Sequence, residues 1–161
     1  MPILNLEKFL KALAKENVKY LLVGGMAGIG HGMNYVTDDL DIYYERTKAN
    51  LRAVVRALTP AQPKLRTPEG DLAFLFDEKT LENGLNFTLS TEWGSIDLLG
   101  ELSGAGKYED LISKAVKLEF YGVEVDTISL DDLIRAKQCA GRTKDKLHLL
   151  ELEAIREMKN K

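Results

Sequence analysis

The sequence has few of the features that mark a secreted or membrane protein. It contains a single cysteine, Cys139, which excludes an intramolecular disulfide. No apolar stretch approaches the roughly 20 residues that a transmembrane helix needs, so no membrane span or membrane partner is expected. The opening segment MPILNLEKFL lacks the charged and then apolar layout of a signal peptide. We therefore expect a cytoplasmic protein.

The chain also lacks an excess of positive charge. The chain has 22 Lys and Arg against 25 Asp and Glu, giving a formal net charge of −3. Such a chain has no overall basic field that would attract nucleic acid, so any anion site must be local. His31 and His148 lie far apart without a cysteine cluster, which makes a zinc site unlikely by composition. At 161 residues, 1–161 is expected to form one domain.

The periodicity of apolar residues predicts an α+β fold. Helical spacing is found near both ends, whereas the middle of the chain is rich in short β-like runs separated by turns. Asn5 is a candidate N-cap, and Ser129 with Asp132 resembles a capping box. Helices are expected over 4–17, 26–33, 48–58, 109–115, 130–140 and 145–158. Strands are expected over 18–23, 40–44, 72–76, 85–90 and 95–100, with a small hairpin around Gly122; three prolines, at 60, 63 and 68, predict a loop.

Two aspartates stand inside a predicted strand, where aspartate is otherwise unfavourable. Residues i and i+2 of a strand face the same way, so Asp39 and Asp41 share one face while Leu40 and Ile42 enter the core. Their backbone positions are about 6–7 Å apart, close enough for both carboxylates to converge on a hard divalent cation. Asp97 lies between Ile96 and Leu98 within SIDLLG, on a later predicted strand, and therefore also faces away from its apolar neighbours. These three acids predict a metal site.

A double glycine, Gly24-Gly25, ends the apolar strand that precedes the acids. Without side chains, it lets backbone amides approach phosphate oxygens, and the helix that follows offers unpaired donors. The alternative without a binding function is a tight turn at the two glycines, followed by an edge strand whose aspartates face the solvent. A dinucleotide-binding turn is disfavoured because GGMAGIG does not give G-x-G-x-x-G. GELSGAGKY is not a P-loop, since Glu101 and Tyr108 replace the required Gly and Ser or Thr.

Lys137 belongs to a predicted helix, four residues after Leu133 and three after Ile134, and so on its apolar, inward face. A lysine in that position requires an anion. A phosphate group above the sheet is one candidate, and a structural salt bridge is the other. Around it, five basic residues within twelve positions form either a solvated face or an electropositive wall: Arg135, Lys137, Arg142, Lys144 and Lys146.

Taken together, these motifs resemble the nucleotidyltransferase superfamily with the DNA polymerase beta type of catalytic core. That family has a strand ending in Gly-Gly or Gly-Ser, an acid-hydrophobic-acid strand and a third acid on a later strand. Here Gly24-Gly25, Asp39-Leu40-Asp41 and Asp97 stand in that order. The match is closest to minimal bacterial members, found as toxin-antitoxin components and antibiotic-modifying enzymes. It covers a core at about 4–100, with a looser match over the helical part at about 129–159.

Smaller features of these relatives are also present. Many carry a threonine before the acids, as Thr37 does here, and a Lys, then Arg and Lys-Asp near the C-terminus, here Lys137, Arg142 and Lys144-Asp145. The chain departs from the pattern at Tyr35, where relatives often have an arginine. It departs again at His148, where some carry an acid.

The resemblance implies a mixed β-sheet backed by helices, with C-terminal helices closing the cleft. It also implies an enzyme that uses Mg²⁺, with two ions expected, to move a nucleoside monophosphate from an NTP such as ATP to an acceptor hydroxyl. Asp39, Asp41 and Asp97 would be the catalytic and metal-binding residues, and Gly24, Gly25, Thr37 and Lys137 would bind the nucleotide. The acceptor, whether small molecule, protein or tRNA, is not specified.

A catalytically silent module is the alternative expectation. Such a chain would act as a regulatory or interaction subunit, for example with an antitoxin-type protein partner. Neither reading assigns roles to Arg142, Lys144 or Asp145. Trp93 is expected to serve ordinary packing rather than base stacking, and Cys139 is expected to be a core residue.

Overall fold

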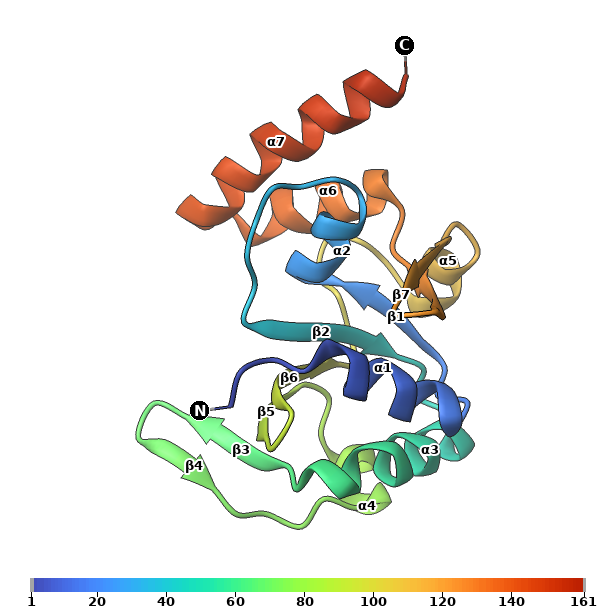
Figure 1. Ribbon diagram of the computed structural model, residues 1–161, viewed down its shortest axis with the longest axis vertical. Helices are drawn as coiled ribbons and strands as arrows, with labels where there is room; N and C mark the ends of the chain where they lie inside the picture. Colours follow the sequence, from blue (N-terminus) through green and yellow to red (C-terminus); the bar gives the residue numbers. More distant parts are fainter. Residues whose placement is uncertain (1, 161) are drawn as a thin grey trace.

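Eight strands of the described residues, 2–160, pair into one mixed sheet in the computed structural model (Figure 1). Their order across the sheet is β4-β3-β5-β6-β2-β1-β8-β7. The central pair, β2 and β6, is parallel, while β1 runs antiparallel to β2. The bounds are β1 (Tyr20–Val23), β2 (Asp39–Tyr44), β3 (Lys64–Thr67), β4 (Gly70–Leu72), β5 (Phe87–Thr91), β6 (Gly94–Leu99), β7 (Val116–Phe120) and β8 (Val123–Thr127).

The helices lie around this sheet, with α6 and α7 at the opposite end of the molecule from α3 and α4 (Figure 1). Their starts follow the expected capping chemistry. The Asn5 side chain accepts a hydrogen bond from the Lys8 amide, and the Ser129 hydroxyl accepts one from the Asp132 amide, both at 3.1 Å. The bounds are α1 (Leu6–Lys15), α2 (Gly24–Gly30), α3 (Lys48–Leu58), a 3₁₀ turn (Thr59–Ala61), α4 (Glu78–Asn83), α5 (Tyr108–Ile112), α6 (Leu130–Ala140) and α7 (Thr143–Lys159).

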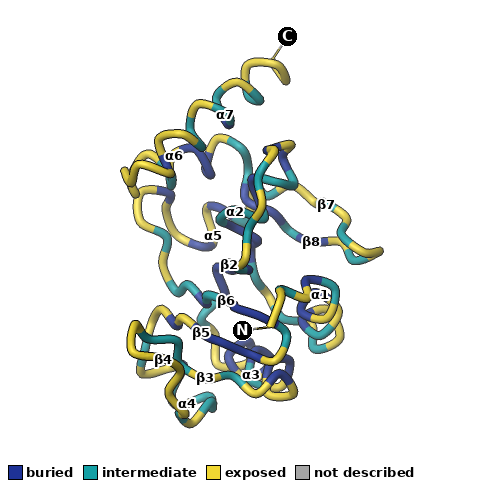
Figure 2. The backbone as a smooth tube through the Cα atoms, turned by 60° about the vertical axis from the view of Figure 1, so that its left-hand side comes forward, coloured by how far each residue is buried: buried dark blue, intermediate teal, exposed yellow. Residues whose placement is uncertain are grey.

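The core fills the space between the central strands and the helices. Leu40 and Ile42 of β2 are fully buried, as are Phe9, Leu10 and Leu13 on the inner face of α1. Figure 2 shows the central strands almost entirely buried, whereas the outer strands and the end of α7 are exposed. The α+β architecture expected from the sequence is confirmed. None of the helices in residues 2–160 is long and apolar enough to span a membrane.

Three local expectations were wrong. The proline-rich stretch contains strand β3, because Pro63 and Pro68 border that strand instead of interrupting it. The segment 72–76 is not a regular strand beyond Leu72, and both Leu72 and Leu75 are exposed. No helix was expected between 76 and 85, yet Glu78–Asn83 forms helix α4, which begins with Asp77 as its N-cap.

Two single-residue expectations had opposite outcomes. Cys139 is exposed near the end of α6, so the expectation that it lies in the core was wrong. Trp93 packs edge-on against Phe9, with ring centroids 5.5 Å apart, which confirms its expected packing role.

Candidate active site

The carboxylates of two neighbouring strands are brought together at the centre of the sheet. Asp41 of β2 is the register partner of Asp97 of β6, and Asp39 is the partner of Ser95. Because side chains alternate along each strand, Asp39 and Asp41 lie on the face opposite to buried Leu40. The structure therefore places the three predicted acids on adjacent strands.

Asp41 and Asp97 share a hydrogen bond between their side chains. Burial, together with the charge of Asp97 and this hydrogen bond, raises the pKa of Asp41 to about 7. Burial also raises the pKa of Asp97, but the hydrogen bond from Asp41 and the charge of Arg66 act in the opposite direction. Of the two carboxylates, Asp41 therefore has the more strongly raised pKa.

Arg66 of β3 lies beside these acids and was missed by the sequence analysis. Its Nη2 donates to Asp97 Oδ1 at 2.8 Å, and its Nη1 donates to the Leu89 carbonyl at 3.1 Å. Nη1 also lies 4.0 Å from Asp39 Oδ1. The residue belongs to the short strand between two prolines that had been interpreted as a loop. Only the alternation of apolar Leu65 with polar Arg66 could have indicated a strand there.

The double glycine lies directly against the acids and the loop before them. Gly24 has φ +67°, a conformation that favours glycine, and a Cβ there would fall within the Asp41 carboxylate. A Cβ on Gly25 would lie 2.7 Å from Tyr35 Cε1 and 3.2 Å from Thr37 Oγ1. The backbone at this turn thus approaches Asp41 and Thr37 as closely as only glycine allows.

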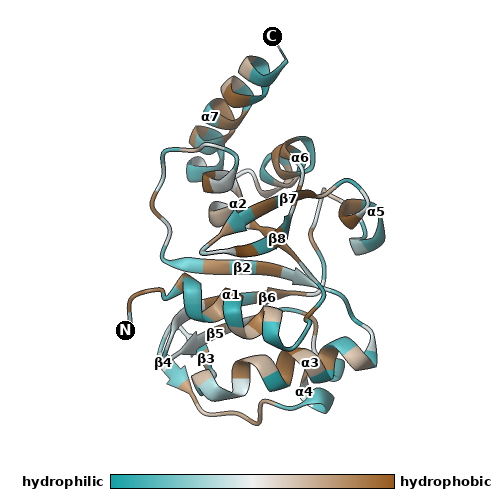
Figure 3. Cartoon of the chain, turned by 45° about the vertical axis from the view of Figure 1, so that its right-hand side comes forward, coloured by the Kyte–Doolittle hydropathy of each residue, from teal (hydrophilic) through white to brown (hydrophobic). Residues whose placement is uncertain are grey.

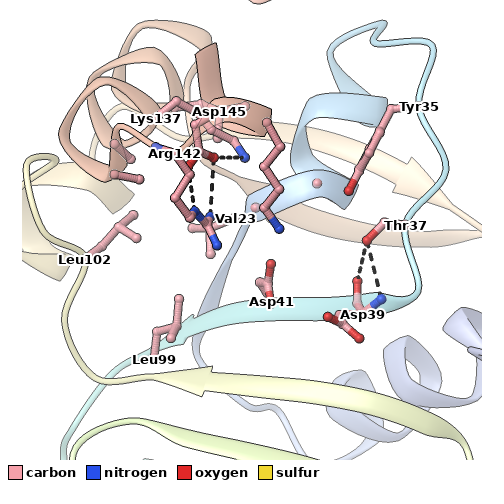
Figure 4. Close-up of a pocket in the computed structure, with 16 residues that line it drawn as sticks. Val23, Tyr35, Thr37, Asp39, Asp41, Leu99, Leu102, Lys137, Arg142 and Asp145 are labelled. Atoms are coloured by element: carbon pink, nitrogen blue, oxygen red, sulfur yellow. Dashed lines mark hydrogen bonds and ion pairs between the residues drawn. The ribbon is translucent and has the colours of Figure 1, made fainter. Parts of the chain in front are cut away.

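Thr37 anchors the start of the acidic strand. Its hydroxyl accepts a hydrogen bond from the Asp39 amide at 3.3 Å and donates to the Asp39 carbonyl at 3.2 Å (Figure 4). Tyr35, two residues earlier, packs its ring edge-on against His148 of α7, with centroids 4.5 Å apart. Tyr35 and His148, the two positions at which the sequence departs from the nucleotidyltransferase pattern, therefore contact each other.

The C-terminal helices contribute an ion cluster above the acids, centred on buried Asp145. Asp145 is fully buried and accepts from Lys137 Nζ at 3.0 Å and from Arg142 Nε at 2.6 Å. Burial alone would raise the pKa of Asp145, but the hydrogen bonds from Arg142 and Lys137 outweigh it and hold that pKa well below its usual range. Lys137 does face inward, and its anion in this structure is the carboxylate of Asp145.

A cavity of about 190 Å³ lies between the acids and this ion cluster (Figure 4). Six of the seven predicted site residues line it: Gly24, Gly25, Thr37, Asp39, Asp41 and Lys137. Asp97 is not among its lining residues and instead faces Arg66. Three residues of unassigned role also line the cavity: Arg142, Lys144 and Asp145. It thus has carboxylates on its floor and cationic side chains on its roof.

The three carboxylates are of the ligand type that binds a hard divalent cation, but they do not surround a common point in this structure. Among residues 2–160, no group of three or more Asp, Glu, His or Cys side chains is positioned to hold a metal ion. Carboxylate oxygens are nevertheless the ligands that Mg²⁺ prefers. A cation beside Asp41 and Asp97 would favour the ionised form of both carboxylates. Arg66 now supplies the nearest positive charge.

Comparisons with known proteins rest on the fold. A scan against protein families and a search of curated proteins find no match for this sequence. Among solved structures, a lincosamide antibiotic adenylyltransferase, LnuA, with lincomycin bound is similar with a TM-score of 0.63 and 14% identity, covering 95% of this chain and 99% of that one.

Two further structures are similar over nearly their whole length. A candidate nucleotidyltransferase from Thermotoga maritima gives a TM-score of 0.57 at 15% identity, covering 99% of this chain and 97% of that one. The antibiotic-resistance factor ANT(2'')-Ia gives 0.51 at 16% identity, covering 96% and 89%. The chain therefore has the fold of the nucleotidyltransferases.

Proposed function

We propose that this protein is a metal-dependent nucleotidyltransferase that moves a nucleoside monophosphate from an NTP to an acceptor hydroxyl. The observation that carries the proposal is the placement of Asp39, Asp41 and Asp97 on adjacent strands beside the Gly24-Gly25 turn. A pair of partly buried carboxylates on adjacent strands is costly for a fold, and such perturbed acids cluster at functional sites.

Asp39, Asp41 and Asp97 would hold the metal, with one or two Mg²⁺ ions. When bound, the metal would neutralise charge on the phosphates and lower the pKa of the acceptor hydroxyl. The backbone at Gly24 and Gly25 would lie against the triphosphate, because both glycines line the cavity and carry no side chain of their own.

Proton transfer in this scheme falls to Asp97. The acceptor oxygen forms a bond to the α-phosphorus, its proton passes to the Asp97 carboxylate, and the bond from the α-phosphorus to the bridging oxygen breaks to release pyrophosphate. The charge and hydrogen bond of Arg66 lower the pKa of Asp97 against the effect of burial, which favours the ionised form that can accept that proton. Lys137 and Arg142 would turn from Asp145 toward the negative charge of the phosphates.

Two classes of acceptor fit this proposal. The similar structures include LnuA, a lincosamide antibiotic adenylyltransferase, and the antibiotic-resistance factor ANT(2'')-Ia, which favours ATP as donor and a small-molecule hydroxyl as acceptor. A toxin-antitoxin component acting on protein or tRNA uses the same chemistry.

The test is thermal unfolding with ATP, GTP, CTP and UTP, each with and without Mg²⁺, followed by transfer of labelled nucleotide. We expect one nucleotide to raise the melting temperature only with Mg²⁺, since ligand at a hundredfold excess over its dissociation constant stabilises by about 2.7 kcal/mol. Asp41→Asn should abolish the shift and the transfer. Asp110→Asn, an exposed change on α5, is the matched control.

A catalytically silent module is the second candidate, and one observation favours it. The cations that would contact substrate and acids are already paired, Arg66 with Asp97 and Lys137 with Asp145. If no nucleotide shifts the melting temperature of wild type, this second reading replaces the first.

A further inference from the structure

Helix α7 is attached to the rest of the protein by one face only. Leu152 on that face is fully buried, and Glu151 Oε1 accepts a hydrogen bond from the Asn34 amide at 2.6 Å. Arg156 Nη1 lies 3.4 Å from Asp131 Oδ1 of α6. These contacts fix the helix against α6 and the loop after α2, while its C-terminal end projects from the body of the molecule (Figure 1).

The outer face of α7 carries an apolar stripe, defined here as Leu147, Leu150, Ala154 and Met158. Spacings of three, four and four residues place all four side chains on one side of the helix. Leu147, Leu150 and Met158 are 65%, 68% and 73% exposed. Figures 2 and 3 show exposed and apolar segments along the same helix. An exposed apolar row of this kind marks an interaction surface.

The stripe is complementary to itself when two copies of α7 run antiparallel. Leu147 and Met158 have their midpoint within one residue of Leu152, and so do Leu150 and Ala154. An antiparallel crossing at Leu152 therefore sets Leu147 against Met158 of a second helix and large Leu150 against small Ala154. This matching of residue i to j and j to i is what a two-fold interface requires.

Charge beside the stripe follows the same symmetry. Lys146 and Glu157 flank it on one side, eleven residues apart, and their midpoint also falls within one residue of Leu152. Both are exposed, and neither side chain forms an ion pair within residues 2–160. In the antiparallel arrangement, each Lys146 meets Glu157 of the other copy.

We propose that this protein forms a two-fold dimer in which the apolar stripe of α7 packs antiparallel on the stripe of a second copy. A second copy is favoured over an unrelated partner because, when two copies of α7 run antiparallel, apolar residues meet apolar residues and Lys146 meets Glu157. The surface lies on the side of α7 away from the anchoring contacts, so the dimer does not depend on nucleotidyl transfer.

The first test measures molar mass by light scattering after size-exclusion chromatography. Wild type is expected at twice the mass of one chain, and Leu147→Glu with Leu150→Glu is expected at the monomer mass. Leu75→Glu is the matched control, because Leu75 is equally exposed at 72% but lies outside α7. Circular dichroism melting should show that all three proteins are folded. A monomeric wild type, or a dimer unaffected by the stripe variant, overturns the proposal.

The second test separates self-pairing from a dimer formed elsewhere. Lys146→Glu and Glu157→Lys should each raise the dimer dissociation constant about tenfold, because two symmetric attractions become repulsions. The double variant should return to within about twofold of wild type, since each pair is then attractive with its order reversed. Two single effects that add in the double variant would contradict the antiparallel register.

Discussion

Replacing Gly24 with alanine tests the close approach between the glycine turn and the acids. The backbone there has φ +67°, where a residue with a Cβ costs about 1–2 kcal/mol. The new Cβ would also fall within the Asp41 carboxylate, and forcing an extra methyl into a packed site costs about 1–3 kcal/mol more. Gly24→Ala should therefore lower the free energy of unfolding by about 2–5 kcal/mol.

Gly122→Ala is the matched control. That glycine has φ +77° in the β7–β8 turn, and a Cβ there would meet nothing within 4 Å. It carries the backbone cost alone, so urea unfolding should show a loss of only about 1–2 kcal/mol. Combining Gly24→Ala with Asp41→Ala should recover part of the larger loss, because the clashing oxygens are gone. Equal losses for the two glycine variants, or strict additivity with Asp41→Ala, would refute the inferred contact.

Three further perturbations test the surroundings of the site. Arg66→Gln should lower the free energy of unfolding by about 1.5–3 kcal/mol in urea melts, as its hydrogen bonds join charged groups, whereas Arg52→Gln at an exposed pair should cost less than about 1 kcal/mol. Asp145→Asn breaks a buried ion cluster and should cost about 3–5 kcal/mol by the same measurement; a loss below that of Arg52→Gln would contradict the cluster. Burial lowers the pKa of His31 below 6.5, although its hydrogen bond to the Ile128 carbonyl opposes this. The unfolded chain then binds more protons, so stability should fall as pH drops below about 6.5, and His31→Asn should flatten that slope.

The sequence was sufficient to predict the parts of the site that depend on strand alternation. Asp39 and Asp41 had to share a face because Leu40 and Ile42 needed the core, and Asp97 followed the same rule. The register that sets Asp41 opposite Asp97 was not predictable, since it depends on the pairing of two strands far apart in the chain. Lys137 was placed inward correctly, but its pairing with Asp145 depends on how α6 and α7 meet.

Arg66 shows why the remainder was missed. In the sequence, the prolines at both ends of this four-residue strand are a stronger signal than its weak alternation of apolar and polar residues. The strand forms because it pairs with β4 and β5, and its own β propensity contributes little. The opposite error occurred at 72–76, where an apolar run has strong β propensity but no partner strand beyond Leu72. In both cases tertiary pairing decided the outcome.

The sheet order also determines when the site can form during synthesis. The pairing of β1 with β2 joins residues that are close in sequence, so the Gly24 turn and Asp41 can meet early. Asp97 is 56 residues later, and the parallel pairing of β2 with β6 must wait until β6 has been made. Leu22 of β1 pairs with Thr127 of β8 later still. A nascent chain whose β6 has not yet emerged therefore has Asp39 and Asp41 without their third acid and without Lys137, so its site is incomplete.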